Sequence, residues 1–196
     1  MKSIEELAKK AKELKEKGLS DKEISTEMHL SLNTILWLLS GEYKGKEAPR
    51  DVKIGWRSIG VYSSRIYYLS EIMADIINEE LYSRGIEPDT ILGITINGIP
   101  FATFISDILG KEIAIFRPSP HKGEGSFSSN YAKVTGKKVV IVDDVVSTGE
   151  TVSKAIEAVK SEGGEPVLIV VIVNKTEKDE ILGVPIRGLI RARMIG

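Results

Sequence analysis

Apolar residues in the first part of the chain recur every three or four positions, the spacing of helices with one apolar face. Three short helices are predicted within residues 3–40, and they begin at Ser3, Ser20 and Ser31. The first two starts carry a glutamate three positions after the serine, a pair that satisfies free backbone N–H groups at the beginning of a helix. A short turn separates the second helix from the third. This order is typical of a helix-turn-helix.

The pattern changes after residues 41–56, a stretch without periodicity that we interpret as mostly linker. A long helix is predicted from Val61 to about Arg84. Beyond it, runs of valine and isoleucine alternate with helical segments, which predicts a parallel sheet covered on both faces and hence an α/β fold. The polar stretch 117–136 predicts a mobile loop of functional length. The expected strands are 90–95, 113–116, 138–142, 166–173 and 185–192, and the expected helices are 100–109 and 149–162.

Composition narrows the class of protein. The 196 residues, of which 42% are apolar, suffice for one ordinary domain with a small appendage. The chain contains no cysteine, which excludes a disulfide framework, a thiolate zinc site and a catalytic cysteine. A formal net charge of -1 excludes a strongly basic, histone-like nucleic-acid binder. Since the chain has no long apolar run and begins with polar residues, we expect a soluble cytoplasmic protein.

The residues that carry chemistry lie at 139–151. Four apolar residues lead to Asp143 and Asp144, and a turn with hydroxyl groups and a glycine then runs into a helix. Open α/β folds bind ligands at the carboxyl ends of their strands, and a helix start presents unpaired N–H groups that suit a phosphate. Two carboxylates followed by such a start fit a ribose 5-phosphate with free 2′ and 3′ hydroxyls. The alternative is an acidic turn with a serine or threonine helix cap.

This stretch resembles the phosphoribosyl pyrophosphate (PRPP) signature of type I phosphoribosyltransferases. The resemblance implies their fold, a parallel-sheet core with a small hood, and it covers roughly residues 60–196. It also implies that Asp143 and Asp144 hold the ribose hydroxyls. The loop around the 5′-phosphate would then be formed by Ser147, Thr148, Gly149, Glu150 and Thr151. Three further segments are similar to orotate phosphoribosyltransferases: a pyrophosphate loop with Thr95, Ile96, Asn97 and Gly98, a flexible catalytic loop that starts at 116–117, and a C-terminal hood strand within 183–190.

The sequence departs from the orotate enzymes in the positively charged side chains of these two loops. Asn97 stands where those enzymes carry a lysine, and Arg117 is followed by prolines, with Lys122 as the next lysine or arginine. Stabilisation of developing negative charge is usually the largest catalytic contribution, so turnover suffers more than binding when a cation is lost. Arg117, Lys122 and Asp144 remain candidates for catalysis, and whether the chain is an enzyme stays open. The resemblance implies Mg²⁺ together with PRPP, held by ligand oxygens and water and not by a protein cage.

A helix-turn-helix ahead of a PRPP-type domain resembles the PyrE-like, orotate phosphoribosyltransferase-like transcriptional regulators of the GfcR group, in which the domain acts as an effector sensor. The implied organisation is a DNA-binding domain at 1–44, a linker at 45–56 and a phosphoribosyltransferase-like domain at 57–196. No lysine or arginine occurs in the third helix, so base contacts would fall to Ser31, Asn33 and Thr34. The alternative for the first domain is a helical cap that docks on the main domain or a partner subunit.

The preferred hypothesis is therefore a DNA-binding transcriptional regulator that senses PRPP or another phosphorylated sugar. The alternative is an orotate or purine phosphoribosyltransferase that uses Mg²⁺ and PRPP and carries a helical extension. We expect a homodimer, because the family resemblance implies one and because regulators that read two half-sites need two-fold symmetry. No membrane partner is expected.

Overall fold

The computed structural model describes residues 3–41, 49, 51–119 and 125–192. The chain divides into two compact units, one that ends at Gly55 and one that begins at Trp56. The boundary between them lies at the end of the expected linker. None of the helices in the described part of the chain is both long and apolar enough to cross a membrane.

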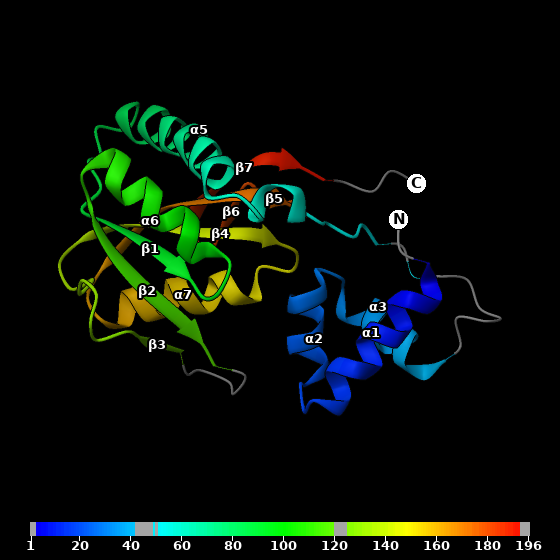
Figure 1. Ribbon diagram of the computed structural model, residues 1–196. Helices are drawn as coiled ribbons and strands as arrows, with labels where there is room; N and C mark the ends of the chain where they lie inside the picture. Colours follow the sequence, from blue (N-terminus) through cyan, green and yellow to red (C-terminus); the bar gives the residue numbers. More distant parts are fainter. Residues whose placement is uncertain (1–2, 42–48, 50, 120–124, 193–196) are drawn as a thin grey trace. The chain divides into compact units, whose positions relative to one another are not determined.

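The first unit consists of three helices, α1 (Ile4–Glu16), α2 (Asp21–Met28) and α3 (Leu32–Ser40) (Figure 1). Both predicted capping boxes are present, at the starts of α1 and α2. The turn between α2 and α3 passes through His29, whose φ of 52° is left-handed. The three apolar faces meet in one small core that contains Ala8, Ala11, Ile24, Met28, Leu30, Ile35 and Leu38.

The second unit is an α/β domain built on one seven-stranded sheet. It opens with α4 (Arg57–Gly60) and α5 (Ser63–Tyr82). The strands then alternate with helices, as the valine and isoleucine runs predict. They are β1 (Thr90–Ile94), α6 (Gly98–Leu109), β2 (Glu112–Pro118), β3 (Gly125–Phe127), β4 (Lys138–Val146), α7 (Glu150–Ser161), β5 (Glu165–Asn174), β6 (Glu180–Ile181) and β7 (Val184–Arg191).

The strand order is β3-β2-β1-β4-β5-β7-β6. The strands β2, β1, β4, β5 and β7 are parallel, whereas β3 and β6 add antiparallel edges. Helices α5 and α6 cover one face of the sheet and α7 covers the other (Figure 1). The main core lies under α7, where Ile156 and Val159 pack on apolar residues of the central strands. The domain thus has the expected parallel sheet with both faces covered.

Most expected elements lie within two residues of their predicted bounds, and two differences bear on the site. Strand β4 continues to Val146, so the acidic pair lies inside the strand and not beyond its end. Pairing with β5 explains the extra length, because Asp143 is in register with Val171 and Val146 with Asn174. The stretch expected to be a loop begins as a hairpin: Arg117 of β2 pairs with Ser126 of β3. Each extension depends on a partner strand that the local pattern does not reveal.

Candidate functional site

The acidic pair lies at the carboxyl end of β4, and both side chains are buried. Asp143 is 8% exposed and Asp144 is 4% exposed. One carboxylate oxygen of Asp143, Oδ1, accepts the backbone N–H of Asp144 over 2.9 Å. Burial raises the pKa of Asp143 well above its usual value, and the neighbouring charge of Asp144 raises it further. Two buried carboxyl groups in sequence oppose folding, which is typical of residues kept for a ligand.

Asp144 accepts two hydrogen bonds on a single oxygen, Oδ2. The indole Nε1 of Trp56 donates over 2.7 Å, and the side-chain Nδ2 of Asn97 donates over 3.1 Å. The structure therefore brings the expected pyrophosphate loop to the acidic pair. It also adds Trp56, a residue that sequence reasoning assigns to the linker. The available signal was a tryptophan in a stretch that is otherwise rich in charged residues and glycine.

Local packing fixes the position of the Trp56 indole. The ring meets Phe101 of α6 edge to face, with centroids 5.5 Å apart and planes at 64°. On another side it lies against Gly60, where a β-carbon would be 2.6 Å from Cζ3 of the indole. Gly60 thus leaves the space that the ring occupies. Trp56 is only half-buried, so the edge of the ring stays accessible to solvent.

The expected pyrophosphate loop connects β1 to α6. The peptide bond between Thr95 and Ile96 is cis, and the Ile96 side chain is 79% exposed. Gly98, the first residue of α6, lies directly over β4, since a β-carbon there would be 2.4 Å from the carbonyl oxygen of Val142. This close approach sets the preceding Asn97 beside Asp144. The loop and the acidic pair therefore form one site.

The expected phosphate loop joins β4 to α7. Ser147, Thr148 and Gly149 form a bend, and α7 begins at Glu150. Gly149 occupies the N-cap position with a φ of 85°, a left-handed conformation that glycine adopts without a steric penalty. No side chain caps the helix from this position, although the Thr148 hydroxyl accepts the N–H of Glu150 over 3.3 Å. The start of α7 therefore offers N–H groups and a partial positive charge to an anion.

The remaining catalytic candidates are not brought to this site by any described contact. Arg117 is exposed on β2, and Lys122 lies outside the described residues. Near that segment, Nζ of Lys154 on α7 donates to the backbone oxygen of Ser119 over 2.6 Å. This bond ties α7 to the beginning of the expected catalytic loop.

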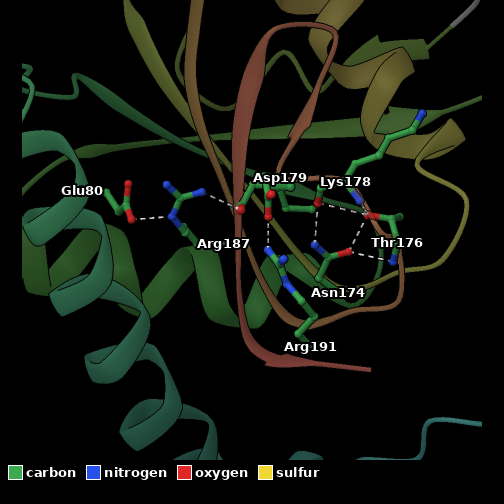
Figure 2. Close-up of polar contacts among 8 residues, drawn as sticks. Glu80, Asn174, Thr176, Lys178, Asp179, Arg187 and Arg191 are labelled. Carbon is green, nitrogen blue, oxygen red and sulfur yellow. Dashed lines mark hydrogen bonds and ion pairs between the residues drawn. The ribbon is translucent and has the colours of Figure 1, made fainter. Parts of the chain in front are cut away.

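The loop after β5 forms a second polar cluster at the carboxyl edge of the sheet (Figure 2). The side chain of Asn174 is fully buried, and its oxygen accepts the N–H and the hydroxyl of Thr176 over 2.8 and 2.7 Å. Two arginines of β7 are engaged in ion pairs, Arg187 with Glu80 and Arg191 with Asp179. Because these groups satisfy one another, the cluster supports the sheet edge beside β4.

In the helical unit, the expected DNA contacts lie at the start of α3. The Ser31 hydroxyl caps the helix by accepting the N–H of Thr34 over 3.2 Å. Thr34 is buried, and its hydroxyl donates to Oδ2 of Asp51 over 2.9 Å. Such a placement does not favour contact between Thr34 and a base edge. Among the three expected residues, only Asn33 has an exposed side chain.

Asp51 comes from the segment that follows the helices. Its Oδ2 also accepts the backbone N–H of Ser31 over 2.5 Å, and the nearby Lys53 donates from Nζ to the carbonyl oxygen of Met28 over 3.1 Å. Residues 51 and 53 fall within the expected linker, yet they bind the turn between α2 and α3. The described end of that segment is thus part of the helical unit.

Comparison with known proteins agrees with this architecture. Residues 65–187 match the family model for the phosphoribosyl transferase domain. The chain is 58% identical over 196 residues to the transcriptional regulator GfcR of Thermoplasma acidophilum, covering all of this chain and 99% of the relative. It is 57% identical over 195 residues to the GfcR of Picrophilus torridus, covering the full length of both.

Among solved structures, orotate phosphoribosyltransferase from Aeropyrum pernix superimposes with a TM-score of 0.60 at 22% identity, over 74% of this chain and 81% of that one. At this identity the likeness concerns the fold, which is that of the type I phosphoribosyltransferases. The full-length matches to the two regulators concern the whole chain, helices included. The chain therefore belongs to the GfcR family of transcriptional regulators, which joins N-terminal helices to a domain with the phosphoribosyltransferase fold.

Proposed function

We propose that this regulator binds DNA through its helical unit and binds PRPP or another phosphorylated sugar at the acidic pair of the second domain. The observation that carries the effector half is the pairing of two buried carboxyl groups, Asp143 and Asp144, with the start of α7, which begins six positions after Asp144 and has a glycine at its N-cap. Carboxylates accept hydrogen bonds from sugar hydroxyls, and the helix start takes the phosphate.

A charge placed in the phosphate loop tests this half of the proposal. Ser147→Asp puts a carboxylate near the start of α7, where it interacts favourably with the helix dipole and repels a bound phosphate. We expect the variant to keep its melting temperature and to lose at least tenfold in affinity for Mg²⁺-PRPP or ribose 5-phosphate by calorimetry. Ser64→Asp, at an exposed position in the first turn of α5, puts the same charge at another helix start and is the matched control. Equal binding by the two variants would contradict a phosphate site at α7.

Mg²⁺ would enter this site with PRPP. Among the described residues no group of three or more histidine, aspartate or glutamate side chains converges on a metal position. A cation held by ligand oxygens and water, with Asp143 and Asp144 nearby, fits this donor set. Calorimetry with PRPP in the presence and absence of Mg²⁺ tests the point.

An active phosphoribosyltransferase is the second candidate, favoured by the same acidic pair and by the fold. The loop 95–98 contains no lysine or arginine to stabilise a departing pyrophosphate, and Asn97 donates to Asp144 instead. A sensor binds PRPP without forming product. Incubation with PRPP and orotate, adenine, guanine or hypoxanthine, followed by chromatography for nucleotide and pyrophosphate, separates the two functions.

The DNA half of the proposal rests on the α2–turn–α3 arrangement in a family of transcriptional regulators. In a helix-turn-helix the first residues of the second helix contact base edges. Asn33 is exposed at that place, and an asparagine side chain pairs well with adenine. Asn33→Ala should weaken specific binding to DNA from upstream of the gene by about 1–3 kcal/mol, measured by fluorescence anisotropy. Ser40→Ala, at the other end of α3, is the control that should bind normally.

The nearly balanced charge of the helical region limits the affinity of a single subunit for DNA. Residues 1–50 hold 10 basic and 9 acidic side chains. Each lysine that neutralises a phosphate adds about 0.9 to the slope of log affinity against log salt. Useful affinity therefore calls for two copies on two half-sites, and we propose a homodimer. A monomeric mass by light scattering at micromolar concentration would refute it.

A further inference from the structure

The segment Asp51–Trp56 is hydrogen-bonded at both ends to places that the proposed function uses. At its start, Asp51 accepts the N–H of Ser31, the N-cap residue of α3, and the hydroxyl of Thr34 in the first turn of that helix. At its end, Trp56 donates to Asp144 of the acidic pair. Only four residues separate these two anchors along the chain. We call residues 51–56 the tether.

The Trp56 bond occupies a position on Asp144 that a sugar hydroxyl can take. A carboxylate oxygen has two lone-pair sites, and Oδ2 of Asp144 already accepts from both Trp56 and Asn97. On the neighbouring carboxyl group, Oδ1 of Asp143 accepts the N–H of Asp144. A ligand hydroxyl that donates to Oδ2 therefore displaces one of the two present donors. An N–H that is released from a half-buried place can bond to water instead, so the exchange costs little.

Trp56 is the donor that can leave. Asn97 is held by its neighbour Gly98, whose backbone lies against the carbonyl oxygen of Val142. The Trp56 indole is held by side-chain contacts, with Phe101 on one side and the open position at Gly60 on another, and it is half-buried. Moreover, Trp56 is the last residue of the tether, so a shift of the indole pulls on a segment whose other end is hydrogen-bonded to the start of α3.

From these contacts we infer that Trp56 reports occupancy of the acidic pair. The ligand displaces the indole from Asp144, and the tether transmits this change to Asp51 at the start of α3, which alters the helix that faces DNA. The inference rests on the proposed function and adds the route by which one site affects the other. Two discrete bonds, Trp56 with Asp144 and Asp51 with α3, define the state without ligand.

Two substitutions act on the indole in opposite ways. Trp56→Phe removes the N–H and keeps an aromatic ring beside Phe101. Gly60→Ala keeps the N–H but places a methyl group 2.6 Å from the present position of Cζ3, so the indole must move away. The first variant takes away the bond that the ligand breaks. The second shifts the indole without a ligand.

The experiment measures ligand binding and DNA affinity on the full-length protein. Mg²⁺-PRPP and ribose 5-phosphate are titrated by calorimetry, and the DNA dissociation constant is measured with and without each. In the wild type we expect the ligand to change that constant by 5–150-fold, the usual range for coupled sites. In Trp56→Phe the ligand still binds by calorimetry, but the ratio of the DNA dissociation constants with and without ligand falls toward one. Gly60→Ala without ligand shifts DNA affinity in the direction that the ligand does in the wild type.

Intrinsic fluorescence gives a second readout, because the chain has only two tryptophans. The difference between wild type and Trp56→Phe isolates the Trp56 emission, and this emission should change on titration with the same half-saturation as the calorimetry. If a ligand binds but the Trp56 emission stays constant, or if Trp56→Phe leaves the effect of the ligand on the DNA dissociation constant unchanged, the inference fails and the proposed function stands. If neither ligand binds the wild type, the proposed effector fails and the inference fails with it.

Discussion

Gly98 lies so close to the carbonyl oxygen of Val142 that a β-carbon on the glycine would be 2.4 Å from that oxygen. The contact joins the first residue of α6 to β4 one position before the acidic pair. It explains why the loop of residues 95–98 and the two aspartates form one site although they are more than forty residues apart in the chain.

Gly98→Ala should therefore destabilise the second domain. The new methyl group meets backbone and not a flexible side chain, so either α6 or β4 must shift, at a cost of about 1–3 kcal/mol or more. We expect a lower melting temperature and a loss of ligand affinity, because Asn97 moves with the helix. Gly55→Ala is the matched control, since a β-carbon there meets nothing within 4 Å. Similar melting temperatures for the two variants would show that the approach is looser than described.

Asp143→Asn should raise stability at neutral pH. Burial raises the pKa of Asp143 above its ordinary value of 3.8, so its stabilising contribution is present in acid and is lost as the pH rises through the raised pKa. An asparagine keeps an oxygen that can accept the Asp144 N–H and carries no buried charge. The variant should have a higher melting temperature than the wild type at pH 7, by about 2–4 °C for each kcal/mol gained in unfolding free energy. The difference in melting temperature should shrink toward pH 4.

The control for this prediction is Asp75→Asn, an exposed aspartate on α5 that should leave the melting temperature unchanged. Binding supplies the second measurement. Asp143→Asn should weaken affinity for Mg²⁺-PRPP while it stabilises the fold. A clear fall in melting temperature at pH 7 would instead assign Asp143 to the fold and not to a ligand.

Asp51→Ala should destabilise the helical unit. The carboxylate accepts the Ser31 N–H and the Thr34 hydroxyl at the start of α3, where a negative charge also interacts favourably with the helix dipole. Hydrogen bonds to a charged group contribute about 1.5–3 kcal/mol, and loss of Asp51 removes the acceptor of the Ser31 N–H and leaves the buried Thr34 hydroxyl with the Ser31 hydroxyl as its partner. Hydrogen exchange should show faster opening of α3, with the second domain unaffected. Unchanged exchange in α3 would refute the role.

Asn174→Ala should loosen the loop between β5 and β6. Its side chain accepts two hydrogen bonds from Thr176 and donates from Nδ2 to the carbonyl oxygen of Lys178 over 3.2 Å (Figure 2). Removing these partners in a buried place should cost about 1–3 kcal/mol of unfolding free energy, measured by urea denaturation. Lys178→Ala is the control, because only its backbone takes part in these bonds with Asn174. If both variants unfold at the same urea concentration, the cluster adds no stability.

The local sequence pattern was sufficient to predict most of the helices and strands of this molecule. The helix starts at Ser3, Ser20 and Ser31 follow from a serine side chain that caps its own helix three residues on, an interaction that needs no distant partner. The parallel sheet follows from buried valine and isoleucine runs between helices. The bend after β4 and the start of α7 likewise follow from a short contiguous motif.

Tertiary structure decided which residues complete each site. Strand β4 extends through the acidic pair because β5 offers backbone partners, and Trp56 and Asn97 reach Asp144 across 88 and 47 positions. The position of Thr34 in α3 predicted a contact with DNA. In the structure the Thr34 hydroxyl instead donates to Asp51, which lies beyond the aperiodic stretch, and stays inside the helical unit. The sequence by itself determines the elements, since a hydrophobic period and a cap are local energies. It does not determine these contacts, since their energy arises only when packing brings distant polar groups into one buried place.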